Sequence, residues 1–197
     1  FTLNIDLKWR KEIVKYLLEK KCKCEFILDL ASGTGDLTKE LLRLNPGFIY
    51  AADISAKMLE IQEKKISDNR LKIIQTDAQA MPFVNEYFDI VTIGFGIRNF
   101  EKLELSLREI NRVLKPGGKL IILEMFKSSG IKTGFFNLYF GKIMPKIGNK
   151  VSKSNAYSYL FNSVDTFYTV KEFIEICENH GFKREYSKNN FMGIVNS

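Results

Sequence analysis

The 197-residue sequence has few of the residues that build disulfide frameworks and metal clusters. It contains three cysteines, Cys22, Cys24 and Cys177, and a single histidine, His180. The Cys-x-Cys pair is too close for a Cys-x-x-Cys redox motif, and the spacing of the three cysteines fits neither a disulfide framework nor a zinc cluster. We therefore expect metal-independent chemistry in a reducing compartment.

Long hydrophobic runs, repeats and low-complexity stretches are also missing. No apolar stretch reaches the ~20 residues that span a bilayer, and residues 1–25 lack the pattern of a secretory signal. Hydrophobic residues make up 45% of the chain and charged residues 27%, an ordinary globular composition. We expect a soluble cytoplasmic protein with a single domain over residues 1–197.

The positive charge is concentrated in one segment. The whole chain has a net charge of +7, and Lys115–Lys153 alone has eight lysines against one acidic residue, Glu124. Aromatic residues lie between these lysines. This mixture predicts a surface for an anionic, partly apolar partner such as an acidic membrane surface, with nucleic acid as the rival. A solvated basic face over an ordinary core is the third interpretation.

Hydrophobic patterning predicts alternating strands and helices. Strands are expected at 26–30, 48–53, 71–75, 88–94 and 119–124. Helices are expected at 6–20, from the first glycine loop to about Leu44, and at 55–66 and 103–114. Such alternation predicts a doubly wound, mainly parallel α/β sheet with helices on both faces. A helix at 170–179 and an antiparallel hairpin of strands 183–187 and 191–195 would end the fold, after an inserted substrate cap at 126–168.

The strongest functional signal is the glycine loop Ser32-Gly33-Thr34-Gly35, which follows the first predicted strand. Asp53 ends the next strand, where a carboxylate can accept hydrogen bonds from ribose hydroxyls. A dinucleotide site would need a third glycine where this chain has Thr38. Asp29, just before the loop, would repel a pyrophosphate and favour an ammonium or sulfonium group. These features favour S-adenosylmethionine over NAD.

Asp77 and Ala78 follow the third predicted strand, on the side of such a sheet where a carboxylate can accept from the adenine amine. Any one of these aspartates could instead cap a turn or a helix. Three of them at successive strand ends, with a glycine loop after the first strand, favour a cofactor site.

At these residues the chain resembles the class I S-adenosylmethionine-dependent methyltransferases, and more narrowly the ubiquinone/menaquinone biosynthesis C-methyltransferase family. The segments that carry this resemblance are 29–38, 52–55, 77–83, 94–100, 112–118, 145–148 and 157–160. The most selective of them is Gly94-Phe95-Gly96-Ile97-Arg98-Asn99-Phe100.

The resemblance implies a seven-stranded, mostly parallel sheet with an antiparallel C-terminal strand. It also implies C-methylation of a polyprenylated quinol, either demethylmenaquinol or a benzoquinol of ubiquinone synthesis, with S-adenosylhomocysteine as the product. Thr34, Asp53, Asp77 and Ala78 match the family's cofactor-contacting positions. Family members often have Ser in place of Gly94 and usually extend further at both ends. The full expected cofactor set is Asp29, Gly33, Thr34, Gly35, Asp53, Ile54, Asp77, Ala78 and Gly94.

Arg98 and Asn99 are the candidate catalytic residues, because they follow the fourth strand at the edge where α/β ligands bind. The guanidinium would stabilise a developing phenolate, and the amide would orient the substrate hydroxyl or a water. The alternative for Arg98 is a structural ion pair with Glu124 or Asp77. His180 is expected at a helix C-terminus, so a histidine base is not predicted.

Tyr157 and Tyr159 in the cap are candidate substrate contacts, with simple packing as the alternative. The expected partners are the polyprenyl quinol and, reversibly, the anionic inner face of the membrane. No nucleic acid is expected, and a homodimer is compatible with the sequence. The alternatives are a methyltransferase for another small molecule or RNA, a non-catalytic S-adenosylmethionine-binding protein and, with least support, an NAD-dependent reductase.

Overall fold

A computed structural model describes residues 5–127, 162–188 and 191–196 of the chain. The chain divides into two compact units. The larger unit comprises Phe1–Glu124 and Ile176–Ser197 and contains the whole β-sheet, and the smaller unit comprises Met125–Glu175. The smaller unit overlaps the segment that the sequence analysis assigned to a substrate cap.

The larger unit alternates strands and helices, as the hydrophobic pattern predicted. The elements before the smaller unit are α1 (Ile5–Glu19), β1 (Phe26–Leu30), α2 (Asp36–Leu41), β2 (Phe48–Asp53), α3 (Ala56–Lys65), β3 (Leu71–Gln75), β4 (Phe88–Gly94), α4 (Leu103–Val113) and β5 (Leu114–Leu123). They are followed by α8 (Val170–Glu178), which spans the boundary between the units, and by β6 (Phe182–Lys188) and β7 (Phe191–Asn196). The first four strands have the predicted bounds.

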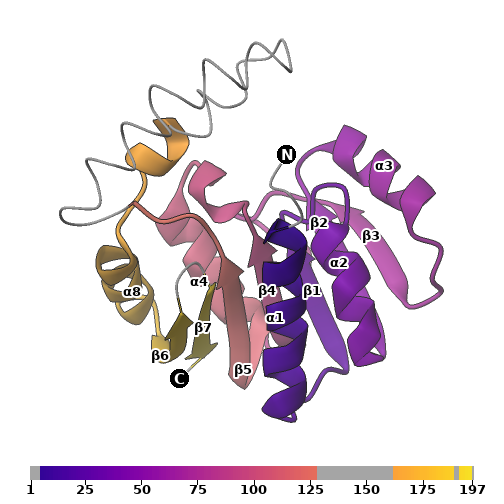
Figure 1. Cartoon of the computed structure of the whole chain (residues 1–197), viewed down its shortest axis with the longest axis horizontal. Helices are drawn as coiled ribbons and strands as arrows, with labels where there is room; N and C mark the ends of the chain where they lie inside the picture. Colours follow the sequence, from indigo (N-terminus) through magenta and orange to yellow (C-terminus); the bar gives the residue numbers. More distant parts are fainter. Residues whose placement is uncertain (1–4, 128–161, 189–190, 197) are drawn as a thin grey trace. The chain divides into compact units, whose positions relative to one another are not determined.

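The strands form one sheet in the order β3-β2-β1-β4-β5-β7-β6 (Figure 1). Strands β1 to β5 pair with one another in parallel, which confirms the predicted mainly parallel sheet. Strand β7 pairs antiparallel with β5 on one side and with β6 on the other. The strand order reverses between β1 and β4, and ligands of α/β sheets bind at such a switch point, beyond the carboxyl ends of the strands.

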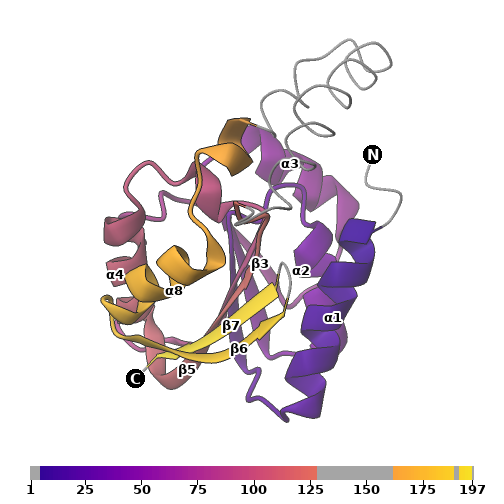
Figure 2. The same cartoon turned by 60° about the vertical axis from the view of Figure 1, so that its left-hand side comes forward.

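Helices cover both faces of the parallel strands. Helices α1 and α2 lie on one face and α4 lies on the opposite face (Figures 1 and 2). Because both faces are covered, a central strand must be apolar along nearly its whole length, and β4 is buried from Phe88 to Ile93. Helix α4 is amphipathic and buries Leu107, Ile110 and Val113.

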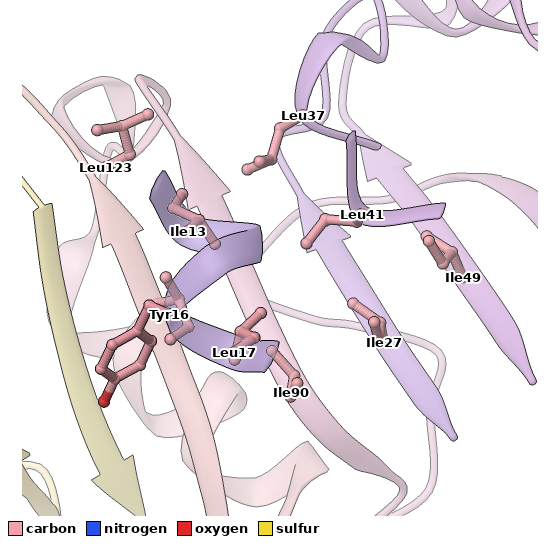
Figure 3. Close-up of a cluster of buried hydrophobic side chains, with 10 residues drawn as sticks. Ile13, Tyr16, Leu17, Ile27, Leu37, Leu41, Ile49, Ile90 and Leu123 are labelled. Carbon is pink, nitrogen blue, oxygen red and sulfur yellow. The ribbon is translucent and has the colours of Figure 1, made fainter. Parts of the chain in front are cut away.

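The core on the α1 face joins the opening helix to the central strands. Ile13 and Leu17 of α1 are almost completely buried, at 0% and 1% exposure. Figure 3 shows them beside side chains from α2 and from several strands. The labelled members of this cluster are Ile13, Tyr16, Leu17, Ile27, Leu37, Leu41, Ile49, Ile90 and Leu123. This packing holds α1 and α2 against the central strands, whose carboxyl ends carry the site.

The helix after the glycine loop runs to Leu44, as predicted, with α2 ending at Leu41 and the last turn, Leu42–Leu44, in the 3-10 form. One predicted boundary was wrong. Strand β5 begins at Leu114 and ends at Leu123, instead of spanning 119–124. Phe88 pairs with Leu114 and Ile90 pairs with Lys119, so the residues between 114 and 119 bulge out of register. Gly117, with φ of 73°, permits this bulge.

Candidate active site

The loop between β1 and α2 forms the first wall of the site. Gly33 and Gly35 have φ angles of 55° and 80°, in the left-handed region that glycine adopts without strain. A Cβ at Gly35 would also lie 2.6 Å from Cγ of Gln62, so a larger residue would displace the loop. The two glycines therefore let the backbone turn tightly at the carboxyl end of β1.

Asp53, at the end of β2, holds this loop. Its Oδ2 accepts a hydrogen bond from the backbone N–H of Gly33 at 2.8 Å, and its Oδ1 accepts one from the backbone N–H of Ser55 at 2.8 Å. Asp53 therefore caps the turn, which was the alternative to ligand binding for the strand-end aspartates. Each carboxylate oxygen also has a second lone pair, so the same group can accept hydrogen bonds from a ligand.

Asp29 is completely buried at the end of β1. The Thr38 hydroxyl donates to its Oδ2 at 2.6 Å, and the Thr92 hydroxyl donates to its Oδ1 at 2.8 Å. Burial raises the pKa of the Asp29 carboxyl from 3.8 to about 6, while the two hydroxyls and the charge of Arg10 oppose that rise. At neutral pH, Asp29 therefore contributes a negative charge to the site from a position already enclosed by protein.

Two neighbouring cavities lie at these strand ends. The larger has a volume of about 440 Å³, and the expected cofactor residues that line it are Asp29, Gly33, Thr34, Asp53, Ile54 and Gly94. The smaller has a volume of about 210 Å³ and is lined by Asp77 and Ala78, together with Asp53 and Ile54. Gly35 is buried and lines neither cavity. All of the expected cofactor residues except Gly35 thus line these two neighbouring cavities.

Asp77 shapes the beginning of the loop between β3 and β4. Its Oδ1 accepts a hydrogen bond from the backbone N–H of Gln79 at 2.9 Å, and its Oδ2 accepts one from the Gln79 side-chain amide at 3.3 Å. As with Asp53, the carboxylate supports a turn and also lines a cavity.

Two residues of α4, which the sequence analysis did not single out, hold the far part of that loop. Arg112 donates to the carbonyl oxygens of Met81 at 3.1 Å and Phe83 at 2.7 Å, and Glu109 accepts from the backbone N–H of Met81 at 3.0 Å. Arg112 and Glu109 also form a two-pronged ion pair, with both N–O distances 2.8 Å, which lowers the pKa of Glu109.

The end of β4 forms the third wall. A Cβ at Gly94 would lie 3.1 Å from Leu37, so this position leaves little room for a side chain. Phe95 follows with a φ of 61°, which is unusual for a bulky residue. A Cβ at Gly96 would lie 2.5 Å from Cβ of Ala31, which itself has a φ of 55°. Residues with positive φ thus follow both β1 and β4 and line the larger cavity, and such strain is typical of functional sites.

Arg98 and Asn99 belong to the 3-10 turn Ile97–Asn99 that follows β4. The guanidinium of Arg98 forms an ion pair with the completely buried carboxylate of Glu124, and the backbone N–H of Arg98 donates to the same side chain at 3.4 Å. The structural pair that we considered as the alternative for Arg98 is therefore present. Asn99 lines both cavities, and Arg98 lines neither of these two.

Arg10 of α1 lines the larger cavity, although the sequence analysis did not assign it to the site. Its side chain is 13% exposed, forms an ion pair with Asp6 and lies with its guanidinium carbon 5.4 Å from the centre of the Phe95 ring. Its Nε is buried without a hydrogen-bond partner among the described residues. A buried donor of this kind is costly unless it is satisfied. The positive charge of the Arg10 guanidinium suits an anionic group in the cavity that this residue lines. The only signal in the sequence was an arginine within an amphipathic helix.

His180 lies outside both cavities. It follows the C-terminal end of α8, where its Nδ1 is 2.8 Å from the carbonyl oxygen of Ile176, so its predicted place at a helix end is confirmed. Tyr157 and Tyr159 lie outside the described residues. Over the described ranges, no group of three or more histidines, cysteines and carboxylates could hold a metal ion. Within the same ranges, no helix is long and apolar enough to cross a membrane.

Solved structures with the same arrangement of strands and helices support the class. A putative S-adenosylmethionine-dependent methyltransferase from Methanococcus maripaludis has a TM-score of 0.67 at 21% identity, over 95% of this chain and 84% of that one. A putative methyltransferase from Bacillus halodurans has a TM-score of 0.64 at 22% identity, over 83% of this chain and 65% of that one. The fold is therefore that of a class I S-adenosylmethionine-dependent methyltransferase.

Sequence comparison gives the family. The sequence model of the ubiE/COQ5 methyltransferase family matches residues 1–197, so the chain belongs to this family and is an S-adenosylmethionine-dependent C-methyltransferase. A demethylmenaquinone methyltransferase of Chlorobaculum tepidum is 38% identical over 190 residues, which cover 93% of this chain and 76% of the relative. Another from Thermotoga maritima is 39% identical over 186 residues, 92% of this chain and 80% of the relative. A Shewanella baltica protein named ubiquinone/menaquinone biosynthesis C-methyltransferase UbiE is 38% identical over 177 residues, 86% of this chain and 70% of the relative.

Proposed function

We propose that this chain transfers a methyl group from S-adenosylmethionine to a ring carbon of a polyprenylated quinol, in the biosynthesis of menaquinone, ubiquinone or both. The observation that carries the proposal is the convergence of the glycine loop, Asp53 and Asp77 on adjoining cavities, in a chain of the ubiE/COQ5 family. The names of the relatives, which refer to demethylmenaquinone and to ubiquinone/menaquinone biosynthesis, support this choice of substrate.

The two cavities suit the two ends of the cofactor. The smaller one offers the Asp77 carboxylate to an adenine amine, and Asp53, which lines both cavities, can accept hydrogen bonds from ribose hydroxyls. In the larger cavity, the negative charge of Asp29 favours a cationic ammonium or sulfonium, and Arg10 can donate to a carboxylate. When bound, the sulfonium supplies an electrophilic methyl group.

The chain's own residues would prepare the nucleophile. A quinol carbon reacts readily only when a neighbouring hydroxyl has lost its proton, which water would accept, so the site must favour the phenolate. We assign Asn99, which lines both cavities, to orienting that hydroxyl, and Arg98 to stabilising the developing negative charge from a position fixed by Glu124. Holding the ring carbon in line with the methyl group would supply much of the remaining rate enhancement.

The segment 126–168 is proposed to cover the quinol, with Tyr157 and Tyr159 as ring contacts. Its lysines and aromatic residues suit a reversible contact with the anionic inner surface of the membrane, from which the prenyl tail would enter. We accordingly propose a cytoplasmic protein that associates peripherally with that surface. A homodimer is compatible with this arrangement.

An anaerobic assay with methyl-labelled S-adenosylmethionine tests the function. Demethylmenaquinol and a prenylated benzoquinol are offered separately, and the extracted quinone is counted for label. Label in the naphthoquinol assigns the menaquinone pathway, and label only in the benzoquinol assigns ubiquinone synthesis.

Asp53→Asn is the control, because it weakens the acceptor for the ribose and should lose most of the label transfer. Cofactor binding without label in either quinol would reject the proposal and favour another acceptor or a non-catalytic binder.

A further inference from the structure

Four polar side chains form a continuous hydrogen-bonded chain behind the glycine loop. The Ser32 hydroxyl donates to Oε1 of Gln62 at 2.9 Å, and Nε2 of Gln62 donates to the Thr38 hydroxyl at 3.0 Å. The Thr38 hydroxyl in turn donates to Oδ2 of Asp29 at 2.6 Å. Gln62, Thr38 and Asp29 are all completely buried. The chain thus connects α3, the glycine loop, α2 and the end of β1.

The direction of these hydrogen bonds follows from their chemistry. An ionised carboxylate only accepts, so the single proton of the Thr38 hydroxyl is committed to Asp29. The hydroxyl must then accept from Gln62, which turns the amide so that its NH₂ group faces Thr38 and its oxygen faces Ser32. Every donor therefore points toward Asp29, and hydrogen bonds aligned in this way polarise and strengthen one another.

Gln62 has no need to be polar for packing. Helix α3 buries only two of its residues, Leu59 and Gln62, and an apolar side chain of the same size could cover the same surface. A buried amide is costly unless both of its ends are hydrogen-bonded. Here both ends are bonded, one to the loop that lines the cofactor cavity and the other to the threonine that contacts Asp29.

We propose that Gln62 is a positioning residue for the cofactor, which keeps the Asp29 carboxylate ionised through Thr38 and fixes the glycine loop through Ser32. Gln62 lines neither cavity and would act without touching the ligand. The proposal rests on the proposed use of this cavity for S-adenosylmethionine.

The other charged groups around Asp29 are independent of Gln62. Arg10 of α1 favours the ionised carboxylate. Asp36 at the start of α2, which forms an ion pair with Lys65, and Asp53 after β2 line the same cavity. Strand β4 contributes only the neutral Thr92 hydroxyl. Variants of Gln62 leave all of these groups in place.

The test compares Gln62→Met and Gln62→Glu with Glu63→Gln, an exposed neighbour on the same helix. The Asp29 carboxyl is titrated by carbon-13 NMR in the chain without cofactor. Gln62→Met removes the donor to Thr38, and the Asp29 titration should move up by about half a pH unit to one unit. Gln62→Glu adds a second buried carboxylate that competes with Asp29 for the proton of the Thr38 hydroxyl. It should therefore move the midpoint of the Asp29 titration to a still higher pH. Glu63→Gln should leave it unchanged.

Binding of S-adenosylhomocysteine, measured by calorimetry between about pH 5 and about pH 8, provides the second readout. Gln62→Met should bind S-adenosylhomocysteine about five- to tenfold more weakly at neutral pH. As the pH is lowered and Asp29 becomes protonated, the affinity of this variant should begin to fall at a higher pH than that of the wild type. An unchanged Asp29 titration overturns the proposal, even if binding weakens equally at every pH, because packing alone would then explain the loss.

Two further outcomes are distinguishable. A wild-type chain that does not bind S-adenosylhomocysteine would reject the proposed function, while the NMR titration would still decide the link between Gln62 and Asp29. If Gln62→Met does not fold, Thr38→Val breaks the same chain one bond closer to Asp29. Thr38→Val must raise the midpoint of the Asp29 titration by at least the half unit to one unit expected for Gln62→Met. An unchanged midpoint would again overturn the proposal.

Discussion

Asp29 makes the stability of the fold depend on pH. Its pKa is about 6 in the folded chain, against an ordinary value of 3.8, chiefly because it is buried. The folded state therefore keeps this proton to a higher pH than the unfolded state does. The contribution of Asp29 to the free energy of unfolding is greatest below about pH 4 and falls as the pH rises to about 6.

Asp29→Asn should remove this dependence, because the amide oxygen can accept from Thr38 and its NH₂ group can donate to the Thr92 hydroxyl. Relative to the wild type, the free energy of unfolding of the variant should rise by about 2.4 kcal/mol between about pH 4 and about pH 7. Urea denaturation at both pH values measures the difference. A constant difference between the two proteins would contradict this prediction.

Arg98 can be tested separately for its structural and its catalytic role. Arg98→Met removes the guanidinium that pairs with the completely buried Glu124, and should lower the free energy of unfolding by about 3–5 kcal/mol. The double variant Arg98→Met/Glu124→Gln removes both charges and should regain most of that stability.

If Arg98 stabilises the phenolate, methyl transfer will stay low in the stable double variant while cofactor affinity is unchanged. Glu124→Gln alone is the control, because it keeps the guanidinium. Wild-type turnover in the double variant would show that the pair is purely structural.

At the scale of elements, α4 determines the shape of the adenine side of the site. Arg112→Met removes the donors to two carbonyl oxygens of the β3–β4 loop and should cost about 2–4 kcal/mol of stability. Amide exchange should accelerate over residues 76–85, and cofactor affinity should fall because Asp77 and Ala78 lie in the same loop.

Arg108→Met is the matched control, since Arg108 is exposed on the same helix. Equal acceleration of exchange in both variants would mean that α4 as a whole, and not the Arg112 contacts, stabilises the loop.

The whole molecule should be stabilised by its cofactor. A ligand at about one hundred times its dissociation constant adds about 2.7 kcal/mol to the free energy of unfolding. For a chain of this size, that corresponds to a rise in Tm of roughly 5–10 °C. S-adenosylhomocysteine should produce this shift in a thermal melt and NAD should not. A comparable shift with NAD would contradict the choice between these cofactors that was made from Thr38 and Asp29.

The sequence was sufficient to predict the positions of the strands and the expected cofactor residues that line the cavities, because glycine loops and strand-end aspartates are local patterns. The first four strands were predicted at their observed bounds. Gln62 and Arg112 act through contacts between residues that lie 24 to 31 positions apart in the sequence. Arg10 lies on a helix whose neighbours only the folded chain defines. Such partners depend on how the elements pack, and a single sequence carries no local signal for them.

The position of β7 in the sheet has a consequence for synthesis on the ribosome. Strand β7 comes after β6 in the chain but lies between β5 and β6 in the sheet, so β6 joins the sheet only through β7. Until residues 191–196 have left the exit tunnel, β5 presents an unpaired edge to other nascent chains. Parallel strands also pair over long loops and therefore form slowly. Emergence of β7 from the tunnel, more than the formation of the cofactor loops, should end the period in which this edge can cause aggregation.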